Sequence, residues 1–148
     1  MSGEGKRLFL DTNVLVYAHD SSAGMKHSQA KQVIQSLWDS RDGCLSIQVL
    51  QEFYVAVTRK VRSPLSATHA RQVVSDLSTW ALHSPTAGDI MNAIDIQQES
   101  GLSFWDAMII QSALQLGATC ILSEDLNPGQ RLRGIVVVNP FRDRSSGC

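Results

Sequence analysis

The strongest constraint on the fold is a short apolar run near the start of the chain that ends in an acid. Leu8–Leu10 is apolar throughout, and Asp11, Thr12 and Asn13 separate it from a second apolar run that begins at Val14. An apolar run without alternation is typical of a strand buried on both faces, and Asp, Thr and Asn commonly cap helices. The pattern predicts a buried strand followed by a helix, with one carboxylate at the carboxyl end of the strand.

The remainder of the chain alternates strand patterns with amphipathic helix patterns. Further strands are expected at 44–47, 80–83, 118–122 and 135–138, and helices at 26–40, 47–60, 66–79, 87–99 and 103–116. This alternation predicts an α/β protein, a three-layer α/β/α sandwich on a parallel sheet of four to five strands. Because no internal repeat or domain boundary is evident, residues 1–148 are expected to form a single domain, ordered over about 7–141 with a flexible tail at 142–148.

The helical periodicity also predicts which helix faces are buried. In the helix at 87–99, Ile90, Met91, Ala93 and Ile94 are expected to point inward. The last predicted helix is apolar on nearly all sides, which is typical of a helix buried within a protein.

Charge and hydropathy bound the function only loosely. The formal net charge is −1, so no basic surface by itself indicates nucleic acid, although a local groove on a neutral protein can still be basic. No segment approaches the ~20 apolar residues that a membrane span needs. The apolar run that stops at Asp11 is also too short for the core of a signal peptide. We therefore expect a cytoplasmic protein with no membrane association.

Three further acids occupy positions similar to that of Asp11. Asp125 follows the predicted strand at 118–122, Asp106 lies in the first turn of a buried helix, and Glu52 lies in the second turn of the helix after the second strand. Strand carboxyl ends and the following helix amino ends share one edge of a parallel sheet, where ligands bind. Four carboxylates are therefore expected in one pocket. Because like charges raise one another's pKa values, such a pocket favours a hard divalent cation, Mg²⁺ or Mn²⁺.

Each acid also has an ordinary structural interpretation. Asp11 can cap the next helix, Asp106 can complete a capping box, and Glu52 can belong to a solvated helix face. Asp125, or its neighbour Glu124, can stabilise a turn. Taken one at a time, most of these interpretations are favoured, but they explain poorly why all four acids reach one edge.

Arg59, Lys60 and Arg62 form the densest basic cluster in the chain. Cations near the end of a helix are favourable to the helix dipole, so solvated helix-end charges are one interpretation. The other interpretation is that they form a binding patch. The sequence leaves both interpretations open.

Four short motifs resemble those of the PIN domain family, most closely the VapC-type ribonuclease toxins of prokaryotic toxin–antitoxin systems. The motifs are Leu10-Asp11-Thr12-Asn13-Val14-Leu15, Ser46 through Gln51-Glu52-Phe53, Ser103-Phe104-Trp105-Asp106-Ala107 and Leu122-Ser123-Glu124-Asp125-Leu126. Any one motif is weak evidence. The set is strong, because it follows the family's order and spacing over about residues 7–141.

The resemblance implies a reaction, site residues and partners. It implies an acidic pocket that binds Mg²⁺ or Mn²⁺ and hydrolyses RNA phosphodiesters. It implies that the metal ligands are Asp11 and Asp106, that Glu52 and Asp125 are the other catalytic acids, and that Thr12, Asn13 and Ser123 support the pocket. Asp125 fits the family's register better than Glu124 does. The family usually pairs the toxin with an inhibitory antitoxin and often dimerises.

The chemistry expected is metal-assisted hydrolysis, which needs no side-chain nucleophile, and the sequence has no strong candidate for a Ser–His or Cys–His pair. Arg59, Lys60 and Arg62 could guide the RNA backbone into a pocket that otherwise repels phosphate. A metal on Asp11 and Asp106 would orient the attacking water, and Glu52 would hold that water or a second metal. One alternative is a catalytically silent PIN-like module that binds RNA or protein. A weaker alternative is a phospho-receiver domain, which needs an acidic pair after the first strand where this chain has Thr12 and Asn13.

Overall fold

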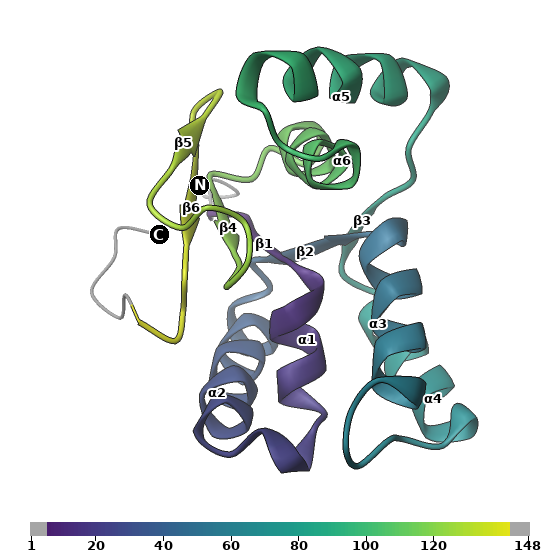
Figure 1. Cartoon of the computed structure of the whole chain (residues 1–148). Helices are drawn as coiled ribbons and strands as arrows, with labels where there is room; N and C mark the ends of the chain where they lie inside the picture. The colour runs from purple at the N-terminus through teal and green to yellow at the C-terminus, as the bar shows by residue number, and fades with distance from the viewer. Residues whose placement is uncertain (1–5, 143–148) are drawn as a thin grey trace.

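The computed structural model describes residues 6–142, which fold around one six-stranded sheet (Figure 1). The strands are β1 (Leu8–Leu10), β2 (Gly43–Ser46), β3 (Ala81–His83), β4 (Cys120–Leu122), β5 (Arg131–Leu132) and β6 (Ile135–Val138), in the spatial order β3-β2-β1-β4-β6-β5. All neighbouring strands are parallel except β5 and β6. The α/β class and the mostly parallel sheet predicted from the sequence are therefore confirmed.

The antiparallel strand β5 is the part of the sheet that the sequence patterns did not predict. It is two residues long and is joined to β6 by Arg133 and Gly134, whose φ angles are both positive, at 48° and 87°. Two such residues make a tight hairpin turn whose twist matches that of the strands beside it. Leu132 pairs with Ile135 across this turn, so β5 covers the outer edge of β6.

Helices cover both faces of the sheet. They are α1 (Thr12–Ala18), the short 3-10 helix η2 (Ser21–Ala23), α2 (Met25–Ser40), α3 (Ile47–Arg59), α4 (Ala67–Leu77), α5 (Ala87–Ser100) and α6 (Phe104–Gln115). Figure 1 shows α5 and α6 on one side of the sheet and α1 to α4 on the other, which gives three layers. Side-chain oxygens of Ser46, Ser66, Thr86 and Ser103 accept backbone N–H groups at the starts of α3 to α6, as caps do.

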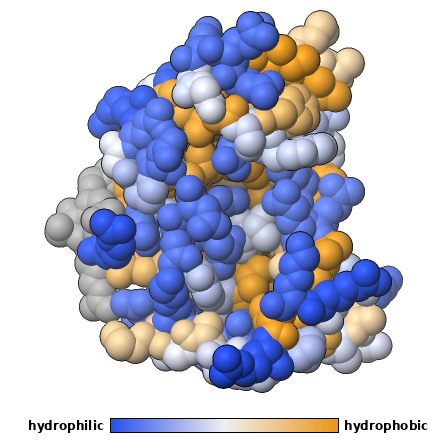
Figure 2. Space-filling model, in the orientation of Figure 1, coloured by the Kyte–Doolittle hydropathy of each residue, from blue (hydrophilic) through white to orange (hydrophobic). Residues whose placement is uncertain are grey.

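The outermost helix corrects one expectation about buried faces. In α5, Ala93 is buried, but Ile90, Met91 and Ile94 are 44 %, 61 % and 40 % exposed. The reason is that α5 packs against α6, which separates it from the sheet, so only a narrow stripe through Ala93 and Ile96 is covered. Figure 2 shows hydrophobic side chains on the surface in this upper part of the molecule. The expectation that α6 is buried nearly all round is confirmed, since residues 107–113 are all buried.

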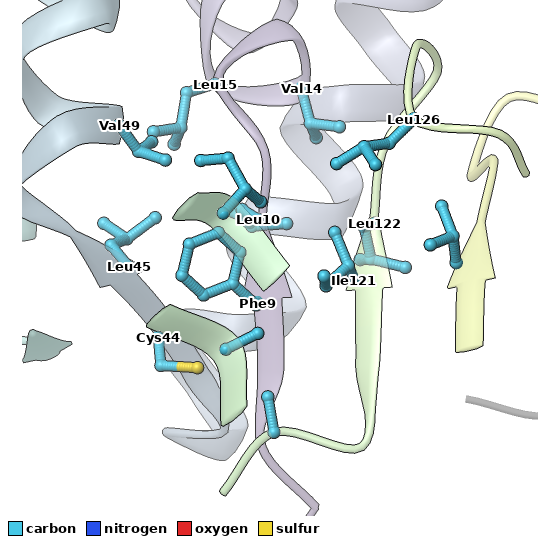
Figure 3. Packing of buried hydrophobic residues seen from close by; sticks show 14 of the residues in the cluster. Phe9, Leu10, Val14, Leu15, Cys44, Leu45, Val49, Ile121, Leu122 and Leu126 are labelled. Atoms are coloured by element: carbon cyan, nitrogen blue, oxygen red, sulfur yellow. The ribbon is translucent and has the colours of Figure 1, made fainter. Parts of the chain in front are cut away.

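The central strand β1 positions the edge at which the predicted acids lie. Phe9 and Leu10 are fully buried and pack among side chains of the neighbouring strands and helices, including Leu45 and Ile121 (Figure 3). β2 and β3 extend the sheet on one side of β1, and β4 begins the other side. The carboxyl ends of β1 and β4 therefore flank a topological switch point, the usual place for a ligand site. Parallel pairing aligns Leu10 with Leu122, so the residues that follow them emerge side by side.

Two remaining expectations concern the ends of the chain and the membrane. Within residues 6–142, no helix is long and apolar enough to cross a membrane. The predicted flexible tail, from residue 143 onward, lies outside the described residues.

Candidate active site

All four predicted acids line one cleft of about 640 Å³. Asp11 follows β1, Asp125 follows β4, Glu52 projects from α3, and Asp106 lies in the first turn of α6. The positions converge because parallel strands end, and the following helices begin, at a common edge of the sheet. Another groove, of about 690 Å³, lies between α3 and α4, is mostly apolar and contains none of these acids. The acidic cleft is therefore the candidate active site.

Asp11 is both a helix cap and the most buried of the four predicted acids. Its Oδ1 accepts a hydrogen bond from the backbone N–H of Thr12 at 2.8 Å, at the start of α1. Its Oδ2 accepts a hydrogen bond from the hydroxyl of Ser123 at 2.7 Å and a longer one from the side-chain amide of Asn13 at 3.4 Å. The side chain is only 8 % exposed. The capping interpretation is thus correct but incomplete, because Oδ2 faces the polar residues of the cleft.

The environment of Asp11 opposes its negative charge. The pKa of its carboxyl is raised to about 6, mainly by burial; the hydrogen bonds from Ser123 and Thr12 offset part of the rise, and the charges of Glu52 and Asp106 add to it. Within the described part of the chain, none of the four acids takes part in a salt bridge. A cation in the cleft would remove this conflict.

The turn after β4 directs its two neighbouring acids to different places. The side-chain amide of Asn13 donates to Asp125 Oδ2 at 3.2 Å, so Asp125 belongs to the cleft. Glu124 turns away and accepts a hydrogen bond from the Tyr17 hydroxyl at 2.6 Å and an ion-paired contact from Lys26. Burial alone would raise the pKa of Glu124, but the Lys26 and Tyr17 contacts lower it overall. The choice of Asp125 made from the sequence agrees with this placement.

Thr12, Asn13 and Ser123 form the polar frame of the cleft. The Thr12 hydroxyl donates to Glu52 Oε1 at 2.8 Å. The Ser123 hydroxyl, besides contacting Asp11, accepts the backbone N–H of Asp125 at 3.1 Å. The carbonyl oxygen of the Asn13 side chain accepts the backbone N–H of residue 124 at 3.2 Å. These bonds tie the segments after β1 and β4 to each other and to α3.

Glu52 and Asp106 differ from Asp11 in exposure. Glu52 is exposed on α3, and its Oε2 accepts a hydrogen bond from Gln48 at 3.3 Å. Asp106 is half-buried, and its backbone N–H donates to the Ser103 hydroxyl at 3.1 Å. Within the described residues the Asp106 carboxylate itself makes no hydrogen bond, so only half of the predicted capping box forms. Capping therefore does not account for this carboxylate.

The basic cluster after α3 is divided by the structure. Lys60 and Arg62 contribute to the lining of the acidic cleft, whereas Arg59 does not. All three side chains are exposed. The two lining cations stand at the rim of a cavity that is otherwise acidic.

The sequence did not point to Asp20, which lines the cleft, or to Gln48, which contacts Glu52 from outside the lining. Asp20 is 8 % exposed, caps η2 by accepting the Ser22 N–H at 3.0 Å, and contributes to the lining. Gln48 joins two helices, because its amide donates both to Glu52 and to the backbone carbonyl of Trp105 at 3.2 Å. The cap pattern at residues 20–22 was a local signal for Asp20, but nothing local could show that it faces the cleft.

The donor chemistry of the cleft suits a hard cation. Its described lining carries carboxylate, hydroxyl and amide oxygens, and neither His nor Cys. Among residues 6–142, no three His, Cys, Asp or Glu side chains are close enough to form a complete metal site as they stand. Mg²⁺ commonly uses one or two carboxylates and completes its shell with water and substrate phosphate, so an incomplete set of protein ligands fits this ion.

Comparison with protein-family models identifies the family. Residues 8–131 match the model of the PIN domain, which is most of the chain. The chain belongs to the PIN domain family. A comparison with curated proteins finds no significant match.

Solved structures show the same fold at low sequence identity. Mycobacterium tuberculosis VapC20, described as a sarcin-ricin loop cleaving toxin, is 19 % identical with a TM-score of 0.61, over 81 % of this chain and 91 % of that chain. A toxin–antitoxin complex from Klebsiella pneumoniae is 21 % identical with a TM-score of 0.66, over 91 % of this chain and 98 % of that chain. DNA-bound VapBC from Salmonella typhimurium is 17 % identical with a TM-score of 0.61, over 89 % of this chain and 96 % of that chain. This chain is thus similar in fold to proteins of toxin–antitoxin systems.

Proposed function

We propose that this protein is a Mg²⁺-dependent endoribonuclease and the toxin of a toxin–antitoxin pair, with Mn²⁺ as an alternative metal. The observation that carries the proposal is the buried carboxylate of Asp11, whose pKa is raised to about 6 in a cleft shared with four other acids, among them Glu52, Asp106 and Asp125. Perturbed acids that cluster in a cleft are characteristic of functional sites. A divalent cation is the simplest way to keep all of them charged at neutral pH.

Asp11 and Asp106 are the proposed metal ligands. Bound there, Mg²⁺ would act as a Lewis acid toward a phosphate oxygen and lower the pKa of water. The chain's own residues would do the positioning. Ser123 and the Thr12 backbone fix the two oxygens of Asp11 in direction, so the carboxylate needs little rearrangement to bind a cation.

Glu52 is the proposed residue that orients the attacking water or binds a second ion. Its two oxygens are held separately, one by the Thr12 hydroxyl and one by the Gln48 amide. It is also the exposed acid of the cleft on α3, so water reaches it freely. Asp125, held by a hydrogen bond from Asn13, would complete the group of acids from the end of the neighbouring strand β4.

The proposed substrate is RNA, bound through its phosphate backbone. Lys60 and Arg62 line the rim of the cleft and can contact phosphates on either side of the scissile bond. Arg59 lies outside the lining, so its contribution would be long-range attraction. The similarity in fold to VapC20, a toxin described as cleaving the sarcin-ricin loop, supports RNA rather than DNA as the substrate class. Similarity to toxin–antitoxin complexes supports an antitoxin protein as the partner.

The test is cleavage of RNA by purified Asp11→Asn protein. We expect Mg²⁺-dependent cleavage by the wild type to fall on the order of a thousandfold in the variant, because a charge that is essential in the transition state is removed. Asp95→Asn is the matched control, since Asp95 is an exposed acid on α5. Undiminished cleavage by Asp11→Asn, with contaminating nuclease excluded by the same purification of both variants, would contradict the proposal.

A further inference from the structure

Trp105 is a large aromatic side chain that the fold leaves uncovered beside the acidic cleft. The residue is 63 % exposed. The other two tryptophans behave differently: Trp38 and Trp80 pack edge to face, with ring centroids 5.2 Å apart. An exposed indole forgoes the large apolar burial that tryptophan usually provides, so this position calls for a ligand or a partner.

The backbone beneath Trp105 is tied directly to the candidate active site. Trp105 immediately precedes Asp106, so their Cα atoms are about 3.8 Å apart. Its carbonyl oxygen accepts a hydrogen bond from Gln48 at 3.2 Å, and the same amide contacts Glu52 at 3.3 Å. The indole therefore projects from a residue whose main chain is fixed between two of the four acids.

The indole also has a rigid support. The ring of Phe104 packs against it edge to face, with centroids 5.1 Å apart and the planes at 74°. Both residues lie in the first turn of α6, whose following turns are buried. An aromatic ring held on a helix in this way loses little conformational entropy when a planar ligand stacks on it.

The other aromatic residue of the cleft is already engaged. Tyr17 contributes to the lining, but its ring packs against Phe141 at 5.3 Å and lies under the Lys26 ammonium at 5.1 Å. Its hydroxyl is bonded to Glu124. Within the described lining and its immediate neighbours along the chain, Trp105 is therefore the aromatic surface left open to a planar group.

We infer that Trp105 is a stacking platform for a nucleobase next to the scissile phosphate and that it makes the enzyme select unpaired RNA. This inference rests on the proposed ribonuclease function. Single-stranded RNA is commonly bound by stacking its unpaired bases on aromatic side chains, whereas the bases of a duplex are already stacked on one another. Because every base has a π face, this contact selects for strandedness more than for sequence.

The first experiment measures binding without cleavage. In the Asp11→Asn background, we expect a single-stranded oligoribonucleotide to quench tryptophan fluorescence and the matching duplex to quench it far less. Trp105→Phe should abolish the quenching, while Trp38→Phe, the matched control, should retain it. Absence of quenching by the single strand, or quenching that persists in Trp105→Phe, would overturn the inference.

The second experiment measures the energetic role of the ring. We expect Trp105→Ala to weaken single-strand binding by about tenfold to a hundredfold, with Trp105→Phe intermediate because it keeps a smaller aromatic face. In the active enzyme, KM for single-stranded substrate should rise by a similar factor. Loss of Trp105 should also reduce the ratio of cleavage of unpaired RNA to cleavage of paired RNA. General destabilisation of the fold would not change this ratio. An unchanged affinity and an unchanged preference in Trp105→Ala would contradict the inference.

The two proposals fail in different ways. If the wild type does not cleave RNA but quenching is lost specifically in Trp105→Phe, the ribonuclease proposal fails and RNA binding at Trp105 stands. If the wild type cleaves RNA and Trp105→Ala cleaves paired and unpaired substrates as the wild type does, only the stacking inference fails. If Trp105 instead binds a protein partner, adding RNA should not change the tryptophan fluorescence, and that result would also overturn the inference.

Discussion

Asp11 and Asp89 are almost equally buried, at 8 % and 7 % exposure, but the protein treats their charges in opposite ways. Asp89 lies at the start of α5 and receives hydrogen bonds on both oxygens, from Gln111 at 2.9 Å, the Thr86 backbone at 2.8 Å and His83 at 3.0 Å. These contacts, led by that of Gln111, lower its pKa. The pKa of Asp11 is raised, mainly because burial is not offset by its fewer strong donors, and its two acidic neighbours add to the rise.

The comparison separates a structural acid from a candidate functional acid. Around Asp89 the fold supplies hydrogen-bond donors that stabilise the carboxylate, and these hydrogen bonds connect β3, α5 and α6. Around Asp11 the fold brings in more acids, which has no structural benefit unless a cation binds. The exposed fraction does not distinguish the two side chains, whereas the balance between desolvation and hydrogen-bond donors does.

The network around Asp89 also contains Ser, His and Asp side chains in contact, since His83 Nδ1 lies 2.8 Å from the Ser112 hydroxyl. This arrangement resembles the order of groups in a nucleophilic triad. Ser112 is fully buried in α6, however, so no substrate can reach its oxygen. We interpret the network as a structural connection between three elements.

The largest effect should come from breaking the Asp89 network. Asp89→Ala leaves His83, Gln111 and the Thr86 N–H without their partner in a buried place. We expect the free energy of unfolding at pH 7 to fall by about 4 kcal/mol, measured by urea denaturation. Because the pKa of Asp89 is lowered in the folded state, its stabilisation is lost as pH falls below the normal range for Asp, so the penalty should shrink in acid. A decrease in the free energy of unfolding smaller than that caused by Asp95→Ala, the control at an exposed acid, would contradict this account.

Asp11→Asn should have the opposite effect on stability. The pKa of Asp11 is about 6 in the folded state against an ordinary value of 3.8. Between these pH values the folded protein binds a proton that the unfolded chain has released, so the ionisation of Asp11 lowers the stability of the fold as pH rises through this interval. Removing the charge should therefore raise the unfolding free energy at pH 7 by up to about 3 kcal/mol without metal, and hardly at pH 4. Unfolding curves in urea at both pH values, in the presence of a chelator, measure the difference. If the variant is less stable than the wild type at pH 7, the charged carboxylate of Asp11 is stabilised by its hydrogen-bond donors, as that of Asp89 is.

A smaller effect should follow from adding Mg²⁺. If the cation resolves the conflict around Asp11, free Mg²⁺ at ten times its dissociation constant should stabilise the wild type by about 1.4 kcal/mol. Asp11→Asn should gain much less, whereas Asp89→Asn should gain as much as the wild type because its carboxylate lies outside the cleft. Thermal unfolding with and without Mg²⁺ measures the shift. Equal stabilisation of Asp11→Asn and wild type would place the ion elsewhere.

Features with a local signal were predicted well from the sequence. Leu8–Leu10 and Asp11 were identified because an uninterrupted apolar run and a capping residue are visible within a few positions. The two-residue strand β5 was missed because it has no hydrophobic pattern, although the Arg133–Gly134 turn was a usable signal. The exposed face of α5 was predicted wrongly because periodicity shows that a helix is amphipathic but not how wide a surface its neighbour covers.

The detailed arrangement of the candidate site depends on contacts between distant parts of the chain. The sequence could not decide whether Glu124 or Asp125 enters the cleft, since the deciding contacts come from Lys26 and Tyr17, about a hundred residues earlier. The link from Gln48 to the Trp105 carbonyl is equally remote. Sequence patterns therefore located the edge of the sheet and its acids, and only the packed structure supplied their partners.

The position of β1 between β2 and β4 has a consequence for how the protein becomes competent as it is made. Asp11 is synthesised before Ser123, whose hydroxyl orients it and which follows 112 residues later. Contacts this remote in sequence form late, because the intervening chain must first be ordered. A nascent chain that has not yet completed β4 carries Asp11 as an ordinary solvated acid. The topology thus delays assembly of the cleft until β4 and Ser123 have been translated.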